Sequence, residues 1–166
     1  IGRYTEALLR RLVNTGHQWF LYSDREITPR FAYDDHVQIR QGHTRPGSPL
    51  SLLYSQLIFP RWARGDCIDV FWSPRHHLPL RLSKGIARVV TVHDLVWKRY
   101  PQTMRRTNWL LEQLLMPLSL QQADRIIAVS EFTRSEVVEV YPDVASACYV
   151  VHEAAEIFAG PSEKSF

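Results

Sequence analysis

A histidine and an aspartate stand together where a strongly apolar part of the chain ends. They belong to the segment TVHDL at residues 91–95, which continues a run rich in β-branched residues. Polar residues at the carboxyl end of a buried parallel strand face the crevice in which α/β proteins bind ligands. His93 could therefore donate to a ligand hydroxyl or act at a reaction centre, with Asp94 orienting it. The alternative is a strand-end histidine followed by a helix-capping aspartate.

Two further segments place polar groups at the start of a predicted helix. The chain opens with IGRY at residues 1–4, where Gly2 would let a phosphate approach the backbone N–H groups of the helix. The alternative role of Gly2 is a tight turn. Ser130 follows the apolar run RIIAV and precedes a helical pattern. It either lines the same crevice or only caps its helix.

A fourth segment, WSPRHHLPL at residues 72–80, also follows a predicted strand. It contains Arg75, His76 and His77. Adjacent histidines point in different directions, and no cysteine or glutamate spacing supports a ligand set, so we expect no metal here. A loop that contacts an acceptor substrate fits this segment better.

Strand and helix patterns alternate along the chain. This alternation predicts an α/β fold with a Rossmann-like parallel sheet and helices on both faces. We expect a helix break near Pro60 and a disturbed helix at Pro117. The predicted strands are 19–22, 36–40, 68–72, 87–92, 125–129 and 148–151, and the predicted helices are 4–13, 50–64, 104–123 and 130–141.

Composition excludes several classes of protein. The 166 residues are 45% hydrophobic and 22% charged, as in ordinary globular domains rather than disordered chains. The apolar runs are too short to span a bilayer, and the start of the chain lacks the apolar core of a secretory signal. The net charge of +3 is too small to suggest nucleic-acid binding. Cys67 and Cys148 match no metal spacing and are expected to be buried, reduced thiols.

Taken in order, these segments resemble the N-terminal half of the group-1 (family four) retaining glycosyltransferases of the GT-B fold. The opening segment at residues 1–5 is similar to the family's Gly-Ile-Gly-Arg-Tyr loop, and residues 91–94 are similar to its strand-end His-Asp. The segment ADRIIAVSEFT at residues 123–133 is the most specific match. Val150 and Val151, followed by Phe158, resemble the strand that leads to the second domain. The ordered set covers almost the whole chain.

The resemblance also has departures. Residues 152–155 read HEAA where the family usually has an Asn-Gly-Val-Asp turn. The family's first strand and its C-terminal donor-binding domain have no counterpart in this sequence. We therefore expect an acceptor-side domain over residues 1–159 and a linker stump over residues 160–166. Since the family's first strand is central in its sheet, we expect this fragment to fold poorly alone or to swap a strand, and to be inactive by itself.

The resemblance implies transfer of a hexose, such as mannose, from a nucleotide-diphosphate sugar to a glycan or lipid-linked acceptor. It implies that His93 contacts the donor sugar near the reaction centre and that Asp94 holds this loop. Gly2 and Arg3 would approach the diphosphate, and Ser130 would line the crevice. No metal or other cofactor is expected. The acceptor candidates are Tyr4, Arg75, His76 and His77.

The same resemblance implies that the protein is cytoplasmic and takes part in polysaccharide biosynthesis. Arg99, Arg105 and Arg106 either contact anionic lipid at the inner face of the membrane or form a solvated helix face. Two other functions compete with the transferase. One is a non-catalytic GT-B-like module that binds a glycan or a partner protein, and the other is a different GT-B enzyme such as a nucleotide-sugar epimerase.

Overall fold

The computed structural model describes residues 2–28, 35–45 and 50–153. Ile1, Phe158 and the predicted linker at residues 160–166 lie outside this part of the chain. Strands and helices alternate in the described part. The elements are α1 (Gly2–Leu12), β1 (Trp19–Ser23), β2 (Val37–Gln41), α2 (Leu50–Leu57), α3 (Phe59–Gly65), β3 (Val70–Ser73), β4 (Ala87–Val92), α4 (Val96–Arg99), η1 (Pro101–Thr103), α5 (Arg106–Gln122), β5 (Arg125–Ala128), α6 (Glu131–Val140), η2 (Pro142–Ala147) and β6 (Cys148–Val150).

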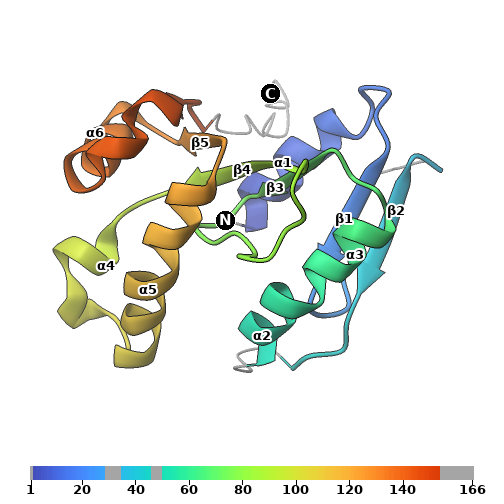
Figure 1. Cartoon of the computed structure of the whole chain (residues 1–166), viewed down its shortest axis with the longest axis horizontal. Helices are drawn as coiled ribbons and strands as arrows, with labels where there is room; N and C mark the ends of the chain where they lie inside the picture. The colour runs from blue at the N-terminus through green and yellow to red at the C-terminus, as the bar shows by residue number, and fades with distance from the viewer. Residues whose placement is uncertain (1, 29–34, 46–49, 154–166) are drawn as a thin grey trace, which may run out of the picture.

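All strand pairs in the described residues are parallel, and they form two sheets. One sheet has the order β3-β4-β5-β6, and the other contains only β1 and β2. The α/β fold with parallel strands flanked by helices is therefore confirmed, although the strands are divided between two sheets. Figure 1 shows β3 and β4 in the middle of the molecule, with β1, β2 and α3 on one side and α4 and α6 on the other.

The centre of the larger sheet is β4, which pairs with β3 on one side and β5 on the other. Its Val90, Thr91 and Val92 are completely buried. The β-branched residues suit a strand that is covered on both faces. The core around β4 is built from strands, helices and the long loop after β3. Its largest fully buried apolar side chains are Leu78, Val90, Val92, Leu95, Met116, Leu120, Ile126 and Val137.

The helix α5 crosses the molecule beside this sheet (Figure 1). Its inner face buries Met116, Ser119 and Leu120. The Ser119 hydroxyl accepts a hydrogen bond of 2.9 Å from the backbone N–H of Leu78, which attaches the loop after β3 to the helix. The sequence predicted a disturbance at Pro117, but α5 continues through this residue as one helix.

Side chains connect the smaller sheet to the rest of the molecule. Tyr22 on β1 packs against Trp62 of α3 and Phe71 of β3, with ring centroids 5.6 and 6.2 Å apart. Its hydroxyl donates a hydrogen bond of 2.7 Å to Asp66, which also forms an ion pair with Arg40 on β2. The carboxylate of Asp66 is almost fully buried. This junction lies just beyond the end of α3.

The sequence missed the short helical elements α4, η1 and η2, and it was wrong about one cysteine. Both cysteines are free thiols, and Cys148 is buried as expected. Cys67 is exposed because it lies in the turn after α3, where its backbone adopts a φ of 53°. The helix predicted over residues 50–64 is interrupted between Leu57 and Phe59, close to the expected break at Pro60.

The orientation of α5 can be tested with two leucines on the same helix. Replacing Leu120, which is 1% exposed, by alanine should lower the free energy of unfolding by about 2–5 kcal/mol. Leu118→Ala changes a side chain that is 47% exposed and should stay within about 0.5 kcal/mol of the wild type. Chemical denaturation of the complete gene product gives both values. Equal losses in the two variants would contradict the described face of α5.

Candidate functional site

Loops from four neighbouring strands meet at one edge of the larger sheet. Because β3, β4, β5 and β6 are parallel, the segments that follow them lie at the same end. These segments carry the predicted site residues other than Gly2, Arg3 and Tyr4, which lie on α1, and several that the sequence did not indicate. They contribute residues 74–77 after β3, residues 93–94 after β4, residues 130–133 after β5 and Glu153 after β6.

The imidazole of His93 is largely buried, with 12% of its side chain exposed. Its Nδ1 lies 2.9 Å from a carboxylate oxygen of Glu153, and its Nε2 lies 3.0 Å from the carbonyl of Pro74. Both ring nitrogens therefore face oxygen acceptors, which could accept both N–H groups of a protonated ring. The ring of Tyr4 from α1 meets the His93 ring edge-on, with centroids 5.1 Å apart. The sequence-predicted Tyr4 and His93 thus lie in contact.

Tyr4 also interacts with the neighbouring strand. Burial raises the pKa of its hydroxyl above the usual value, and the nearby Glu153 carboxylate raises it further, against the effect of a hydrogen bond with Thr91. The indole N–H of Trp72 donates to the same Thr91 hydroxyl at 3.0 Å. This polar contact therefore ties the first turn of α1 to β3 and β4.

The backbone of His93 is held from both sides. Its N–H donates to Nε2 of His76 at 3.2 Å, and its carbonyl accepts a hydrogen bond of 3.2 Å from the Thr133 hydroxyl. His76 comes from the loop after β3 and Thr133 from the first turn of α6. The loop after β4 is consequently fixed by the segments that follow both neighbouring strands.

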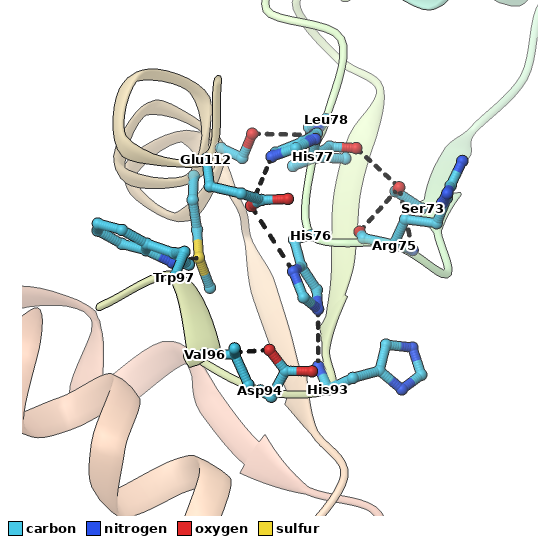
Figure 2. A network of polar contacts seen from close by, with 12 residues as sticks. Ser73, Arg75, His76, His77, Leu78, His93, Asp94, Val96, Trp97 and Glu112 are labelled. Carbon is cyan, nitrogen blue, oxygen red and sulfur yellow. Dashed lines mark hydrogen bonds and ion pairs between the residues drawn. The ribbon is translucent and has the colours of Figure 1, made fainter. Parts of the chain in front are cut away.

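Glu112 on α5 connects the two adjacent histidines (Figure 2). One of its oxygens lies 2.9 Å from Nε2 of His77 and 3.7 Å from Nδ1 of His76. Burial opposes ionisation of this carboxyl, but the contacts with His76 and His77 outweigh that effect and lower its pKa to about 2. Glu112 is therefore an anion at neutral pH. His76 and His77 face this carboxylate, whereas the side chain of Arg75 is exposed.

Asp94 supports the backbone rather than the ring of His93. Its Oδ1 accepts a hydrogen bond of 3.1 Å from the N–H of Val96 at the start of α4, as Figure 2 shows. This contact, at the first residue of α4, is of the kind that the helix-capping alternative for Asp94 describes. Asp94 also lines a pocket of about 300 Å³, together with His76, Val96, Trp97, Met104 and Glu112.

Ser130 uses its side chain to cap α6. Its hydroxyl accepts a hydrogen bond of 3.0 Å from the N–H of Thr133, the contact expected of an N-cap serine. The Ser130 and Thr133 hydroxyls also lie 2.9 Å apart. Ser130 thus reaches His93 through Thr133. Gly2 and Arg3 are exposed in the first turn of α1, next to Tyr4.

Sequence reasoning missed Glu112, Thr133 and Glu153. Glu112 did leave a signal, because it is the only acidic residue in the 17 residues of α5. Thr133 was part of the quoted segment at residues 123–133 but had no assigned role. Glu153 lies in the segment that departs from the usual family turn, and nothing in its neighbours indicated a contact with His93.

No group of three or more histidine, cysteine or acidic side chains in residues 2–28, 35–45 and 50–153 is arranged to hold a metal ion. The histidines around Glu112 lie within these ranges. Within the same ranges, no helix is sufficiently long and apolar to cross a membrane. Arg99, one of the arginines considered for lipid contact, forms an ion pair with buried Glu136 and lies over the ring of Phe132. Its guanidinium is thus engaged within the protein.

The sequence matches the domain described as Glycosyltransferase Family 4 over residues 1–155, and the chain belongs to this family. A comparison with curated proteins found no match. The fold and the family together define a glycosyltransferase domain, which acts between a sugar donor and an acceptor.

The carboxylate of Glu112 should make stability depend on acid pH. A carboxyl whose pKa is lowered in the folded state stabilises the protein above its unfolded value of about 4.5 and loses that contribution as the pH falls toward 2. Glu112→Gln should lower the free energy of unfolding by about 1–3 kcal/mol at pH 7. The difference from the wild type should shrink between pH 4.5 and 2. Urea denaturation across this pH range measures it.

Glu139→Gln serves as the matched control for this measurement, since it changes an exposed carboxyl on α6. Its stability should run parallel to that of the wild type over the whole range. A constant difference between Glu112→Gln and wild type from pH 7 down to pH 2 would contradict the role of the Glu112 charge.

Proposed function

We propose that this chain is the acceptor-side N-terminal domain of a retaining glycosyltransferase that moves a hexose from a nucleotide-diphosphate sugar to a glycan or lipid-linked acceptor. The observation that carries the proposal is the position of His93 within a family-four domain. Its ring lies at the carboxyl edge of the sheet, and its backbone is fixed from two sides. A fixed imidazole at that edge suits recognition of the sugar at the reaction centre.

In the proposed reaction, the bond between the anomeric carbon and the diphosphate oxygen breaks, and a bond to the acceptor oxygen forms. The acceptor hydroxyl gives its proton to the departing diphosphate oxygen, and the nucleotide diphosphate leaves. His93 contacts the donor sugar, and Asp94 keeps the loop in place through Val96. Positive charge and N–H groups stabilise the leaving diphosphate without a metal. The exposed first turn of α1, with Gly2 and Arg3, can be approached by such a group.

The acceptor is proposed to bind beside the loop after β3. Arg75 offers an exposed cation there, and Tyr4 offers an aromatic ring next to His93. His76 and His77 border the same region but use ring nitrogens in contacts with Glu112. We therefore propose that His76 and His77 assist acceptor binding by shaping the loop as well as by contacting the acceptor.

A lipid-linked acceptor would require the cytoplasmic domain to approach a membrane surface. The exposed face of α5 supports such an approach. Leu110, Leu114 and Leu118 are about half exposed along one side of this helix, and Arg106 lies at its start. Apolar and basic side chains in this order suit an interface with anionic lipid. Peripheral membrane contact is thus proposed for α5 rather than for Arg99.

The proposed function predicts release of nucleotide from one sugar donor. The complete gene product is incubated with a panel of GDP- and UDP-sugars in the presence of glycan and lipid-linked acceptors, and released nucleotide is quantified. His93→Ala should reduce release from the accepted donor by about tenfold or more, which corresponds to roughly 1.4 kcal/mol of barrier.

His43→Ala is the control in the same assay, because His43 is an exposed histidine in the loop after β2. Its rate should match that of the wild type. Absence of release and of nucleotide binding with every donor would instead favour a non-catalytic module that binds a glycan or a partner.

A further inference from the structure

The hydrogen bond between His93 and His76 identifies the proton pattern of the His76 ring. The backbone N–H of His93 donates to Nε2 of His76, so this nitrogen must be the bare acceptor. The single proton of a neutral His76 ring is then on Nδ1. A proton on Nε2 would make the N–H of the His76 ring face the backbone N–H of His93. Both groups are donors, so the N–H of His93 would lose its hydrogen-bond partner.

The opposite side of the same ring faces a carboxylate. Nδ1 of His76 lies 3.7 Å from an oxygen of Glu112, and the same oxygen contacts Nε2 of His77 at 2.9 Å. Only 19% of the Glu112 side chain is exposed, so water screens its charge weakly. A negative oxygen beside Nδ1 favours the tautomer with its proton on that nitrogen. Figure 2 shows the resulting order, in which His76 lies between Glu112 and the backbone of His93.

We propose that Glu112 is a positioning residue for His93: it selects the Nδ1–H tautomer of His76, whose bare Nε2 then holds the backbone N–H of His93. The three interacting residues come from three elements: Glu112 from α5, His76 from the loop after β3, and His93 from the loop after β4. The consequence for sugar transfer rests on the proposed function of His93. The selection of the tautomer does not depend on any substrate.

The loop that carries His76 has anchors that do not involve Glu112. The Ser73 hydroxyl lies 2.7 Å from the carbonyl of His77, and the N–H of Leu78 donates to Ser119 on α5. Removal of the charge should therefore leave the loop in place and change mainly the proton on the ring. The effect of Glu112 on the His76 tautomer can therefore be distinguished from a role in which Glu112 only holds the loop in place.

Three other titratable side chains surround His76, namely His77, His93 and Asp94, and none of them forms an ion-pair contact with its ring in the described part of the chain. The rings of His77 and His93 have centroids 6.5 and 5.8 Å from that of His76. Asp94 lines the same pocket, but one of its oxygens already accepts from Val96. Glu112 is the carboxylate that forms an ion-pair contact with His76 in the described part of the chain.

The experiment is nuclear magnetic resonance of the complete gene product labelled with nitrogen-15 in histidine. Long-range proton–nitrogen correlations report which ring nitrogen is protonated, and hydrogen exchange reports the protection of the His93 amide. In the wild type, Nδ1 of His76 should be protonated and Nε2 bare. In Glu112→Gln, the tautomer with its proton on Nε2 should become detectable, because an amide can donate to Nδ1 and only the N–H of His93 then still opposes a proton on Nε2. Exchange of the His93 amide should rise by about tenfold.

Glu139→Gln is the control and should leave both readings unchanged. A protonated Nε2 in wild-type His76 would overturn the proposal, and so would an unchanged tautomer and unchanged His93 exchange in Glu112→Gln. A pH titration of the wild type tests the contact between His76 and the His93 amide, on which the proposal depends, and needs no variant. The His93 amide resonance should shift together with the protonation of the His76 ring, and independence of the two would also overturn the proposal.

Kinetics distinguish this proposal from the proposed function. If a donor is found, Glu112→Gln should lower kcat several-fold and leave KM for the donor within about twofold. The resonance measurements need no sugar donor. A negative nucleotide assay would therefore contradict the proposed function, while the role of Glu112 would still be decided by the resonance measurements.

Discussion

The pairing of β4 with a parallel neighbour on each side determines the surroundings of His93. Parallel strands end at the same edge, so the segment after β4 is enclosed by the segments after β3 and β5. His76 and Thr133 come from these two segments and bind the N–H and the carbonyl of His93. A residue that is held at both its backbone N–H and its carbonyl can move only if its neighbours move too. The site therefore obtains its rigidity from the sheet rather than from the loop itself.

The helix α5 supplies the second constraint. Its inner face carries Ser119 and Glu112, which both engage the loop after β3. The hydrogen bond of Ser119 to Leu78 sets the position of that loop, and Glu112 sets the charge next to its histidines. The two contacts are seven residues apart, about two helical turns, and so lie on the same side of the helix. One helix face thus combines packing of the core with electrostatic control of the site.

The sequence predicted the strands that form the candidate site well, for a physical reason. The segment at residues 87–92 is rich in valine, as a buried parallel strand requires, and the polar pair after it marks the carboxyl edge. The strand before it begins at Val70 rather than at residue 68, since pairing with β4 starts there. Short elements such as α4 and η2 have too few residues to show a periodicity.

The role of Glu112 could not be predicted from the sequence in the same way. A single carboxylate in a leucine-rich helix ordinarily faces solvent. Its contact with His76 and His77 depends on which side of α5 meets the loop after β3, and that loop is joined to the helix only by tertiary contacts. Glu153 presented the same difficulty, because its contact with His93 links positions 60 residues apart.

The junction at Asp66 affects how cooperatively the two sheets unfold. Backbone ladders join β3 to β6 into one sheet, whereas β1 and β2 are attached to it through Tyr22, Arg40 and the buried carboxylate of Asp66. A side-chain junction can separate while both ladders stay intact, because opening it breaks no strand pairing. We therefore expect the smaller sheet to open locally at a lower free energy than the sheet that carries His93. Thermal fluctuations of one need not disturb the other.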